Sequence, residues 1–542
     1  MRTSETKWWG WGAAGKRLRL APGAVRMLSE RLGEADPSPP VALEEVRVPP
    51  AAPLPEAVVR TVGSENVLDA DEDRIRHATG MSYPDLIRLR NGRIETAPDA
   101  VLVPRDHEQV AAVIEACSRE GVAVVPFGGG TSVVGGVDPI RGGLERVISL
   151  DLGRLRAVEV DRRSLIARLG AGMPGPAAEQ ALGEHGVTLG HFPQSFEYAT
   201  IGGFAATRSA GQASSGYGRF DDLVTGVRLT SPAGELRTGE TPHNAAGPAL
   251  RELVLGSEGV LGVITEVAAR VRPAPEARRY EAWMASGFEE GGGIVRELAQ
   301  SDALPDVVRL SDREETRVSL GLAGPEGLGA VALDTYLRLR RRADGCILVV
   351  GWEGDREAVA RRRALAVRRL RSGGAVPLGV RAGRAWERGR FEGPYLRDEL
   401  LDLGYMVETL ETAHTWTRLG ELYDGVRGAI QAALEGQGTP GLAFCHLSHA
   451  YRDGASLYFT FIARRRPGEE VGQWRVVKSA ACEAIVRAGG TITHHHAVGR
   501  DHAPYMPAEV GELGLEALRA VKQRLDPPGI MNPGKLLADQ GR

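Results

Sequence analysis

The chain has 542 residues, of which 42% are hydrophobic and 25% are charged, so it is long enough to form two or more domains with full hydrophobic cores. Its formal net charge of -3 gives no basic field that would attract a phosphate backbone, and nucleic acid is therefore not an expected partner. The four cysteines are far apart and form no CxxC pair, which argues against a thiolate zinc site and a disulfide framework. The chain has neither an apolar run of membrane-spanning length nor the apolar core of a secretory signal, so a cytoplasmic location is expected.

Residues 1–96 are expected to form an N-terminal strap of helices and extended segments. The first part contains "KWWGWG", with Trp8, Trp9 and Trp11, and the middle contains the proline-rich "DPSPPVALEEVRVPPAAPLP". The prolines predict an extended segment between elements. The tryptophans are expected to pack the strap onto the body of the protein, and the alternative is contact with a membrane surface.

The segment "APDAVLVPRDHEQVAAVIEACSREGVAVVPFGGGTSVVGG", from residue 97, predicts a strand, a helix from roughly 106 to 119 and a second strand that runs into glycines. The loop from Pro126 to Gly136 consists of small residues whose backbone N–H groups can bind a pyrophosphate, and a flexible turn is the alternative. A second run, "GAGMPG" from Gly170, matches G-x-G-x-x-G, but Pro174 interrupts it and no acidic residue ends a clear second strand. We therefore expect no dinucleotide site there.

Residues 276–480 alternate helical stretches such as "REAVARRRALAVRRLRS" with strands such as "CILVVGWEG" and "ASLYFTFIA". This alternation predicts a second α+β domain. In "ASLYFTF", the period of a strand places Tyr458 and Thr460 on one face, while Phe459 and Phe461 take the other.

The C-terminal part, residues 481–542, contains "TITHHHAVGRDH" and then a helix that Pro-Pro-Gly stops. In an extended segment the side chains of His494 and His496 lie on one face and that of His495 lies on the other. The three side chains are therefore not expected to share one function. The histidine run can be a metal site, a solvated loop or an acid–base group beside a cofactor. Because no carboxylate lies at a persuasive spacing in the sequence, no metal is expected, and the solvated loop and the acid–base group both stay open on these residues alone.

Three segments, "PFGGGTSVVGG", "PQSFEYATIGGFAATRSAG" and "LVLGSEGVLGVITEV", occur in this order, and "DPPGIMNPGKL" follows near the end. Together they resemble the FAD-binding domain of flavoproteins of the vanillyl-alcohol oxidase type, in which the last sequence lies beside the flavin. The resemblance implies an α+β protein with a two-subdomain FAD-binding domain over residues 97–275 and an α+β substrate cap domain over residues 276–480. It also implies that the C-terminal segment, residues 481–542, returns to the flavin site.

The FAD-binding residues that the resemblance implies lie in four runs. They are Pro126, Phe127, Gly128, Gly129, Gly130, Thr131 and Ser132; Gln194, Ser195, Phe196, Glu197, Tyr198, Ala199 and Thr200; Thr207, Arg208, Ser209 and Ala210; and Glu258, Gly259, Val260, Leu261, Gly262, Val263 and Ile264. Relatives that bind FAD covalently often carry a histidine within the glycine loop. Thr131 occupies that place here, so noncovalent FAD is expected.

Two further segments, "CHLSHAYRDGASLYF" and "THHHAVG", distinguish between members of this superfamily. They do not match the His-Gly-Asp-Gly-Asn and Glu-His-Gly motifs of proteins that resemble D-lactate dehydrogenase. Together with "KWWGWG" and "PYLRD", they are similar to the alkylglycerone-phosphate synthases, and the likeness extends over nearly the whole chain. This resemblance implies an FAD-dependent transferase of ether lipid synthesis, which exchanges the acyl group of acyl-dihydroxyacetone phosphate for a long-chain alcohol.

The same resemblance assigns roles to single residues. The catalytic residues that it implies are Tyr458, His494, His495, His496 and Arg309, and the substrate-binding residues are Arg397 and His446. Imidazole and phenol groups suit the proton transfers of such an exchange, and guanidinium groups suit a phosphate. Eukaryotic members have an arginine where this chain has His446, which leaves open the anion that is bound.

Structural alternatives exist for each of these residues. Without the resemblance, Tyr458 is a core aromatic, Arg309 and Arg397 form surface salt bridges, and His446 and His449 are core histidines. Two other functions also stay open: an FAD-linked oxidoreductase that acts on a D-2-hydroxy acid or related alcohol, and a nonenzymatic flavin-binding protein. The expected partner is a lipid-like small molecule, and the sequence is compatible with a homodimer and with peripheral contact to a membrane.

Overall fold

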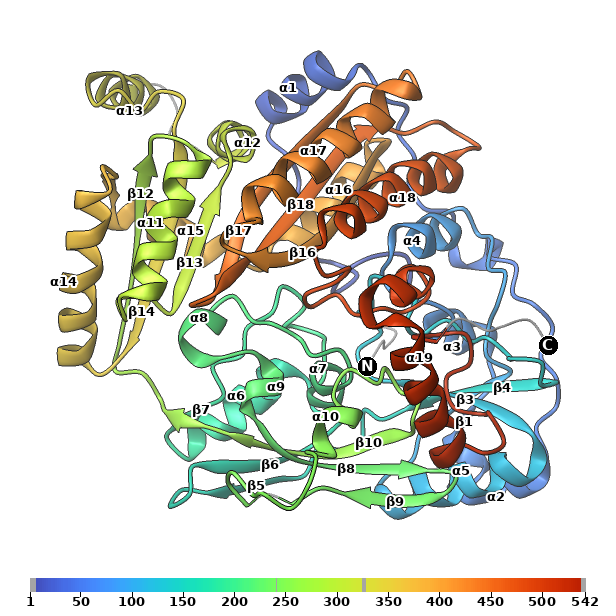
Figure 1. The fold of residues 1–542 in the computed structure, drawn as a ribbon. Helices are drawn as coiled ribbons and strands as arrows, with labels where there is room; N and C mark the ends of the chain where they lie inside the picture. Colours follow the sequence, from blue (N-terminus) through green and yellow to red (C-terminus); the bar gives the residue numbers. More distant parts are fainter. Residues whose placement is uncertain (1–5, 240, 324–327, 538–542) are drawn as a thin grey trace.

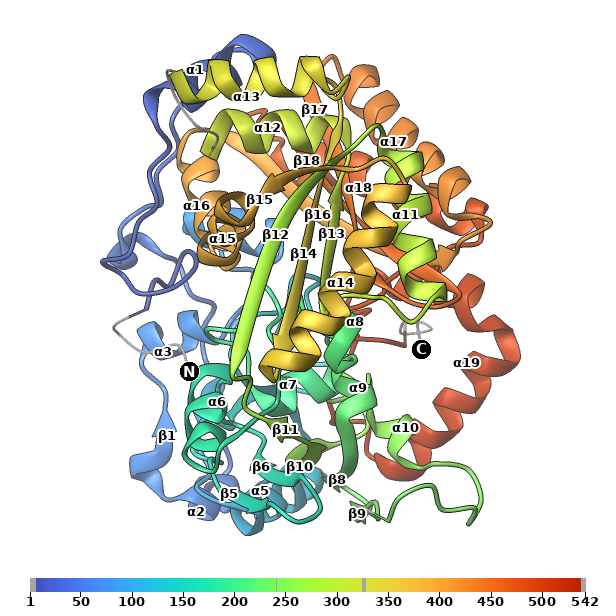
Figure 2. The ribbon, with the colours of Figure 1, turned by 90° about the vertical axis from the view of Figure 1, so that its left-hand side faces the viewer.

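The computed structural model describes residues 6–239, 241–323 and 328–537 of the chain. Figures 1 and 2 show a lower half built on two larger sheets and an upper half built on one larger sheet, with the N-terminal segment running along both. Helices pack on the sheets of both halves, and most of the strand pairs are antiparallel. This architecture confirms the expected α+β class.

The N-terminal strap connects the two halves. Its helices are α1 (Pro22–Leu32), α2 (Glu56–Val62), α3 (Asp71–Arg76) and α4 (Tyr83–Arg90). Helix α1 packs on the upper half, whereas α2 packs on the lower half against α5 (His107–Glu120). Trp8 and Trp11 are buried, and Trp9 packs beside them. Trp11 therefore packs the strap onto the body, as expected, whereas Trp8 and Trp9 pack mainly against other residues of the strap.

The lower half contains a four-stranded sheet of order β1-β2-β4-β3 and a five-stranded antiparallel sheet of order β5-β6-β10-β8-β9. Helix α5 contacts both sheets and corresponds to the helix predicted at 106–119. The side chain of Asp106 caps the start of α5, and Gly121 ends it in a left-handed conformation. The strands are β1 (Val67–Leu68), β2 (Ala100–Leu102), β3 (Val122–Phe127), β4 (Arg146–Asp151), β5 (Val158–Asp161), β6 (Ile166–Gly170), β8 (Val224–Ser231), β9 (Gly234–Arg237) and β10 (Val263–Arg270).

Short elements complete the lower half. They are α6 (Gly175–Glu184), β7 (Val187–Thr188), α7 (Ile201–Ala206), α8 (Ser214–Tyr217), α9 (Phe220–Leu223), α10 (Arg251–Val254) and β11 (Arg272–Pro273).

The upper half is a seven-stranded antiparallel sheet of order β15-β12-β14-β13-β17-β18-β16 with helices on both faces. The strands are β12 (Ala277–Ala285), β13 (Val307–Ser311), β14 (Cys346–Gly354), β15 (Val376–Gly379), β16 (Tyr405–Thr415), β17 (Gly441–Ala450) and β18 (Gly454–Arg464). The helices are α11 (Phe288–Gln300), α12 (Arg313–Ala323), α13 (Leu328–Leu339), α14 (Arg356–Ser372), α15 (Val380–Gly389), α16 (Gly393–Asp402), α17 (Leu419–Gly436) and α18 (Glu470–Ala488).

The two faces of this sheet have different surroundings. Helices α11, α14, α17 and α18 cover one face through a hydrophobic core that includes Phe459 and Phe461. The other face carries Tyr458 and Thr460, which line a cavity shared with the lower half. The alternation predicted for "ASLYFTF" is confirmed.

The C-terminal helix α19 (Met506–Leu525) runs from the upper half to the lower half (Figure 1), where Met531 bridges to Val124 of β3. Helix α18 spans residue 480, where we place the boundary between the cap and the C-terminal segment. We propose that the domain boundaries lie at residues 96, 275 and 480. Among the described residues, no helix combines the length and hydropathy that crossing a bilayer requires.

Candidate active site

A cavity of about 500 Å³ lies between the two halves of the molecule. Its lower wall includes most of the predicted FAD residues: Pro126, Gly128, Gly129, Gly130, Thr131, Ser132, Gln194, Ser195, Ala199, Thr200, Thr207, Ser209, Ala210, Glu258, Gly259, Gly262 and Ile264. Its upper wall includes Arg309, Arg397, His446, Tyr458, His495 and His496. Residues from distant parts of the sequence thus meet at one cavity.

Eight predicted FAD residues do not line this cavity: Phe127, Phe196, Glu197, Tyr198, Arg208, Val260, Leu261 and Val263. Phe127, Val260, Leu261 and Val263 are buried apolar residues, and Phe196 packs between Phe192 and Phe391. Arg208 forms an ion pair with Asp221, and Glu197 accepts a hydrogen bond from Tyr395. Each predicted FAD-binding run therefore contains residues that line the cavity and neighbouring residues that support them.

The glycine loop after β3 is shaped by close backbone approach. A Cβ atom at Gly128 would lie 2.4 Å from Thr200 Oγ1, and one at Gly129 would lie 1.9 Å from the Tyr198 carbonyl oxygen. Ser132 Oγ accepts a hydrogen bond of 2.9 Å from Gly136 N, which closes the turn. The loop therefore presents bare backbone to the cavity, as a pyrophosphate cradle requires.

The other glycine run, "GAGMPG", joins β6 to α6 but lines no part of this cavity. A Cβ atom at Gly172 would lie 1.6 Å from the Leu152 carbonyl oxygen. These glycines serve close packing within the chain.

The C-terminal sequence "IMNPGK" secures the cradle from outside. Asn532 Nδ2 donates to the carbonyl oxygens of Gly136 at 3.1 Å and of Glu258 at 2.6 Å, and its backbone N–H donates to Val124. Lys535 Nζ donates to the Asp138 carbonyl oxygen. One segment thus ties together the glycine loop and the 258–264 run.

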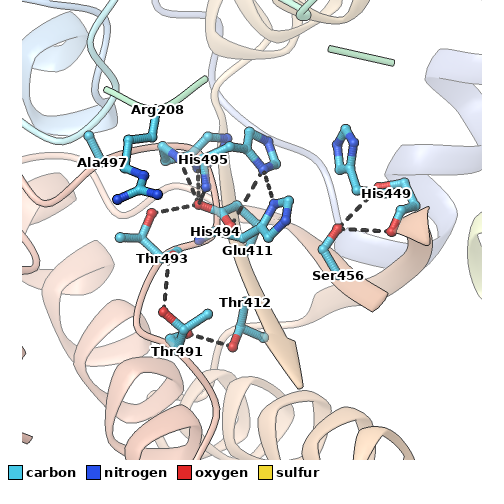
Figure 3. A network of polar contacts seen from close by, with 12 residues as sticks. Arg208, Glu411, Thr412, His449, Ser456, Thr491, Thr493, His494, His495 and Ala497 are labelled. Carbon is cyan, nitrogen blue, oxygen red and sulfur yellow. Dashed lines mark hydrogen bonds and ion pairs between the residues drawn. The ribbon is translucent and has the colours of Figure 1, made fainter. Parts of the chain in front are cut away.

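Two buried carboxylates hold the histidine run and the residues that follow it, and Figure 3 shows the first of them, Glu411. Glu411 of β16 accepts hydrogen bonds from Thr493 Oγ1 and from the backbone N–H groups of His494, His495 and His496, at 2.5 to 3.1 Å. Glu258 accepts from the N–H groups of Val498 and Gly499, both at 2.8 Å. Ala497, which joins the histidines to these two residues, has a φ of 74°.

The alternation predicted for the three histidines is wrong. In an extended segment successive N–H groups point in opposite directions, whereas here three of them converge on one carboxylate. His495 and His496 consequently both line the cavity, and His494 lies behind them.

The sequence offers no carboxylate at a persuasive spacing from the histidines, but the fold brings one to them. Glu411 lies 83 residues before His494 in the sequence, so local spacing could not find it. A ligand atom from each of Glu411, His494 and His495 lies within 4.8 Å of the others, which is a possible cation geometry. Both Glu411 oxygens, however, already accept hydrogen bonds.

Tyr458 lies among imidazole rings. Its ring stacks on His446 at a centroid distance of 4.8 Å and on His495 at 6.0 Å, and it meets His496 edge-on at 5.4 Å. Burial raises the pKa of Tyr458 and lowers the pKa of each of these three histidines. Neutral rings and a protonated phenol therefore face one another at neutral pH.

The carboxyl group of Glu411 is held in its charged form. Burial by itself would raise its pKa, but a proton on His495, His496 or His494 and the hydrogen bond from the backbone N–H of His495 lower this pKa well below the ordinary value. An anion thus lies directly behind a set of neutral imidazoles, where it favours any ring that gains a proton.

The arginines of the upper wall lie near this cluster, and Arg309 is joined to it through Glu315 and His446. Arg309 Nη2 lies 2.7 Å from Glu315 Oε1, and His446 Nδ1 lies 3.0 Å from the same oxygen. Despite burial, Arg309 and His446 hold the pKa of Glu315 at about 2. Arg397 Nη1 donates to the Met81 carbonyl oxygen, while its buried Nε has no hydrogen-bond partner among the described residues.

A third part of the cavity is apolar. It is lined by Leu20, Leu28, Val318, Leu396, Leu400, Val407, Phe444 and Ile462. Most of these side chains belong to one hydrophobic cluster formed by α1, α12, α16 and the β16–β17–β18 part of the sheet. This surface suits an alkyl chain rather than a charged ligand.

The fold and the site define a flavoprotein of the FAD-linked oxidase class. A family model described as "FAD binding domain" matches residues 98–239, and one described as "FAD linked oxidases, C-terminal domain" matches residues 274–536. A solved structure of a 4-ethylphenol oxidase from Gulosibacter chungangensis has the same fold, with a TM-score of 0.67 and 15% identity over 90% of this chain and 97% of that one.

Two more similar proteins identify the family. An alkyldihydroxyacetonephosphate synthase from Dictyostelium discoideum is 31% identical over 98% of this chain and 93% of its own. A solved structure titled alkyldihydroxyacetonephosphate synthase matches with a TM-score of 0.85 and 29% identity over 98% of both chains. The chain belongs to the alkyldihydroxyacetonephosphate synthase family.

Proposed function

We propose that this protein exchanges the acyl group of acyl-dihydroxyacetone phosphate for a long-chain alcohol, with noncovalently bound FAD. The observation that carries the proposal is that one cavity joins a glycine cradle, a phenol–imidazole cluster, two arginines and an apolar wall. Incubation with the acyl substrate and a radiolabelled long-chain alcohol tests it, since the label should appear in an ether. The runner-up, oxidation of a 2-hydroxy acid, has less support because the named relatives are synthases.

Each part of the cavity has a proposed task. The glycine loop and the 194–210 and 258–264 segments would hold FAD, and the chemistry that reduced FAD supplies when bound is nucleophilic substitution at carbon 1 without net redox change. Arg309 and Arg397 would bind the phosphate. The apolar wall would bind the acyl or alkyl chain.

The proton transfers fall to the cluster on the upper wall. Tyr458, His495 and His496 would move protons between carbon 1, the entering alcohol and the leaving carboxylate. Glu411, which the sequence did not reveal, would position the imidazoles and stabilise a protonated ring. Glu315 would hold His446 and Arg309 beside each other at the anion site.

Replacing Gly129 with valine should abolish FAD binding, because the new Cβ atom would lie 1.9 Å from the Tyr198 carbonyl oxygen. Absorbance of the purified protein measures the bound flavin. Gly420→Val is a matched control, since a Cβ atom there meets nothing within 4 Å, and it should keep its FAD. Flavin released from the parent protein by acid would support the noncovalent linkage, and flavin retained in the pellet would refute it.

The histidine run should act without a metal, so dialysis against a chelator should leave exchange unchanged. His495→Ala or His496→Ala should lower turnover while FAD stays bound, because each removes a ring that lines the cavity. Elemental analysis measures the metal content, and exchange assays after dialysis measure the activity. Stoichiometric zinc that is lost together with activity would show that the histidines are ligands.

The acid limb of the exchange reaction should lie below pH 6.5, the ordinary histidine value. The imidazoles must be neutral to accept protons, and burial lowers their pKa, so acid must be stronger than usual to charge them. The pH dependence of kcat/KM measures this limb. A limb above pH 7 would show that these rings are not the proton acceptors.

Long-chain substrates reside in membranes, and we therefore propose a cytoplasmic protein in peripheral contact with a membrane surface. Co-sedimentation with phospholipid vesicles tests this contact. A homodimer remains a proposal from the sequence, and light scattering of the holoenzyme tests it.

A further inference from the structure

The proposed exchange, on which this inference rests, releases one proton in each turnover. The ester C–O bond at carbon 1 breaks, an ether C–O bond forms, and the products are an ether and a carboxylic acid that ionises at neutral pH. No atom is oxidised or reduced overall. The proton begins on the hydroxyl of the alcohol, inside the cavity, and must reach the solvent.

A line of hydrogen-bonded groups crosses the wall of the cavity behind His495. His495 lines the cavity, and its Nδ1 lies 3.1 Å from His494 Nδ1. His494 does not line the cavity, and its Nε2 lies 2.8 Å from the hydroxyl of Tyr451. Tyr451 is partly exposed and lies in the turn between β17 and β18.

The chemistry of this line suits proton transfer. A neutral imidazole has one N–H donor and one acceptor nitrogen, so each ring can receive a proton on one nitrogen and release another from the second. Burial lowers the pKa of His494 and of His495, which keeps both rings neutral between turnovers. His495 Nδ1 also lies 3.6 Å from Glu411 Oε2, so a transient positive charge on that ring has an anion beside it.

The other groups that face these two rings are mostly uncharged. They are His191, His446, His449, His496 and Tyr458, together with the cation Arg219. Arg219 opposes a lasting positive charge on either ring, and it also hydrogen-bonds the hydroxyl of Tyr451, beside which the carboxylates of Asp221 and Asp222 act.

We propose that His494 and Tyr451 form a proton relay that carries the proton released in each turnover from His495 to the solvent. The hydroxyl of the alcohol gives its proton to His495. His495 passes a proton to His494, and His494 passes one to the hydroxyl of Tyr451 as that hydroxyl releases its own to water. Each group returns to its starting state after its tautomer resets.

Tyr451→Phe in the holoenzyme tests this relay, because it keeps the ring and removes the hydroxyl. At low buffer concentration, kcat for exchange should fall by about tenfold or more with KM unchanged. Added imidazole buffer should restore kcat in proportion to its concentration, whereas the parent protein should not respond. Tyr336→Phe is the control, since that partly exposed tyrosine also loses one hydrogen bond, to Pro377, and should behave like the parent.

Two kinetic results would overturn the relay: parent-like kcat in the Tyr451→Phe variant at low buffer, or a loss that is equal at every buffer concentration. A second measurement does not depend on turnover. Histidine ring nitrogen signals in NMR spectra should change for both His494 and His495 in the variant, with a His494→Gln protein for assignment. Unchanged His495 signals would refute the connection, whereas absence of ether formation by the parent would refute the proposed function instead.

Discussion

Replacing Tyr458 with phenylalanine should reduce acyl-for-alkyl exchange by about 10²- to 10⁴-fold, the usual contribution of a general acid or base. The phenol lies between the rings of His446 and His495 on the cavity face of β18. Phenylalanine keeps the ring and its stacking, so FAD content and the melting temperature should stay close to the parent values. Exchange assays, flavin absorbance and thermal unfolding measure the three quantities.

Tyr405→Phe is the matched control for this variant. Tyr405 is a buried tyrosine of β16, its hydroxyl donates to the Gly33 carbonyl oxygen, and it does not line the cavity. Its variant should lose about 0.5–1.5 kcal/mol of stability with the hydrogen bond but keep its activity. Parent-like exchange by Tyr458→Phe would mean that the phenol only packs.

Replacing Glu411 with glutamine should have the second-largest effect, a loss of about 10²- to 10³-fold in exchange, which is typical when a preorganised polar contact at an active site is removed. The carboxylate accepts four hydrogen bonds, and the amide group of glutamine would turn a donor toward some of these donors. The histidine run should therefore shift relative to Tyr458.

A change in the pH profile separates this role from a purely structural one. Glu411 raises the pKa of His495 and His496, so removal of its charge should move the acid limb of kcat/KM to lower pH. Glu408→Gln is the control: Glu408 is buried in the same strand, but it binds Trp474 and Thr409 rather than the histidine run. An acid limb that stays in place in Glu411→Gln would contradict the electrostatic role.

Local patterns in the sequence predicted the parts of the site that depend on neighbouring residues. Strand period placed Tyr458 on one face of β18, and the glycines after an apolar strand predicted a loop with exposed backbone. The strand alternation and the glycine loop both depend on backbone geometry within a few residues, which can be predicted from the local sequence.

Contacts between distant segments could not be predicted in this way. Glu411 stands within "YMVETLETAHT", and a carboxylate inside an apolar strand was the available signal, but nothing local connected it to residues 494–496. The position of Tyr451 beside His494 likewise depends on the turn between β17 and β18 meeting the C-terminal segment. The apolar wall is assembled from α1, α12, α16 and the sheet, and it exists only after the strap has folded onto the cap.

Exchange and net oxidation at this cavity leave different products and different flavin spectra. The most direct test is an anaerobic incubation of the holoenzyme with acyl-dihydroxyacetone phosphate and a radiolabelled long-chain alcohol. Ether and free fatty acid should form in equal amounts, and the flavin spectrum should be the same before and after turnover. Absence of labelled ether, together with bleaching of the flavin by a 2-hydroxy acid, would contradict the proposed function and support an oxidoreductase on the same fold.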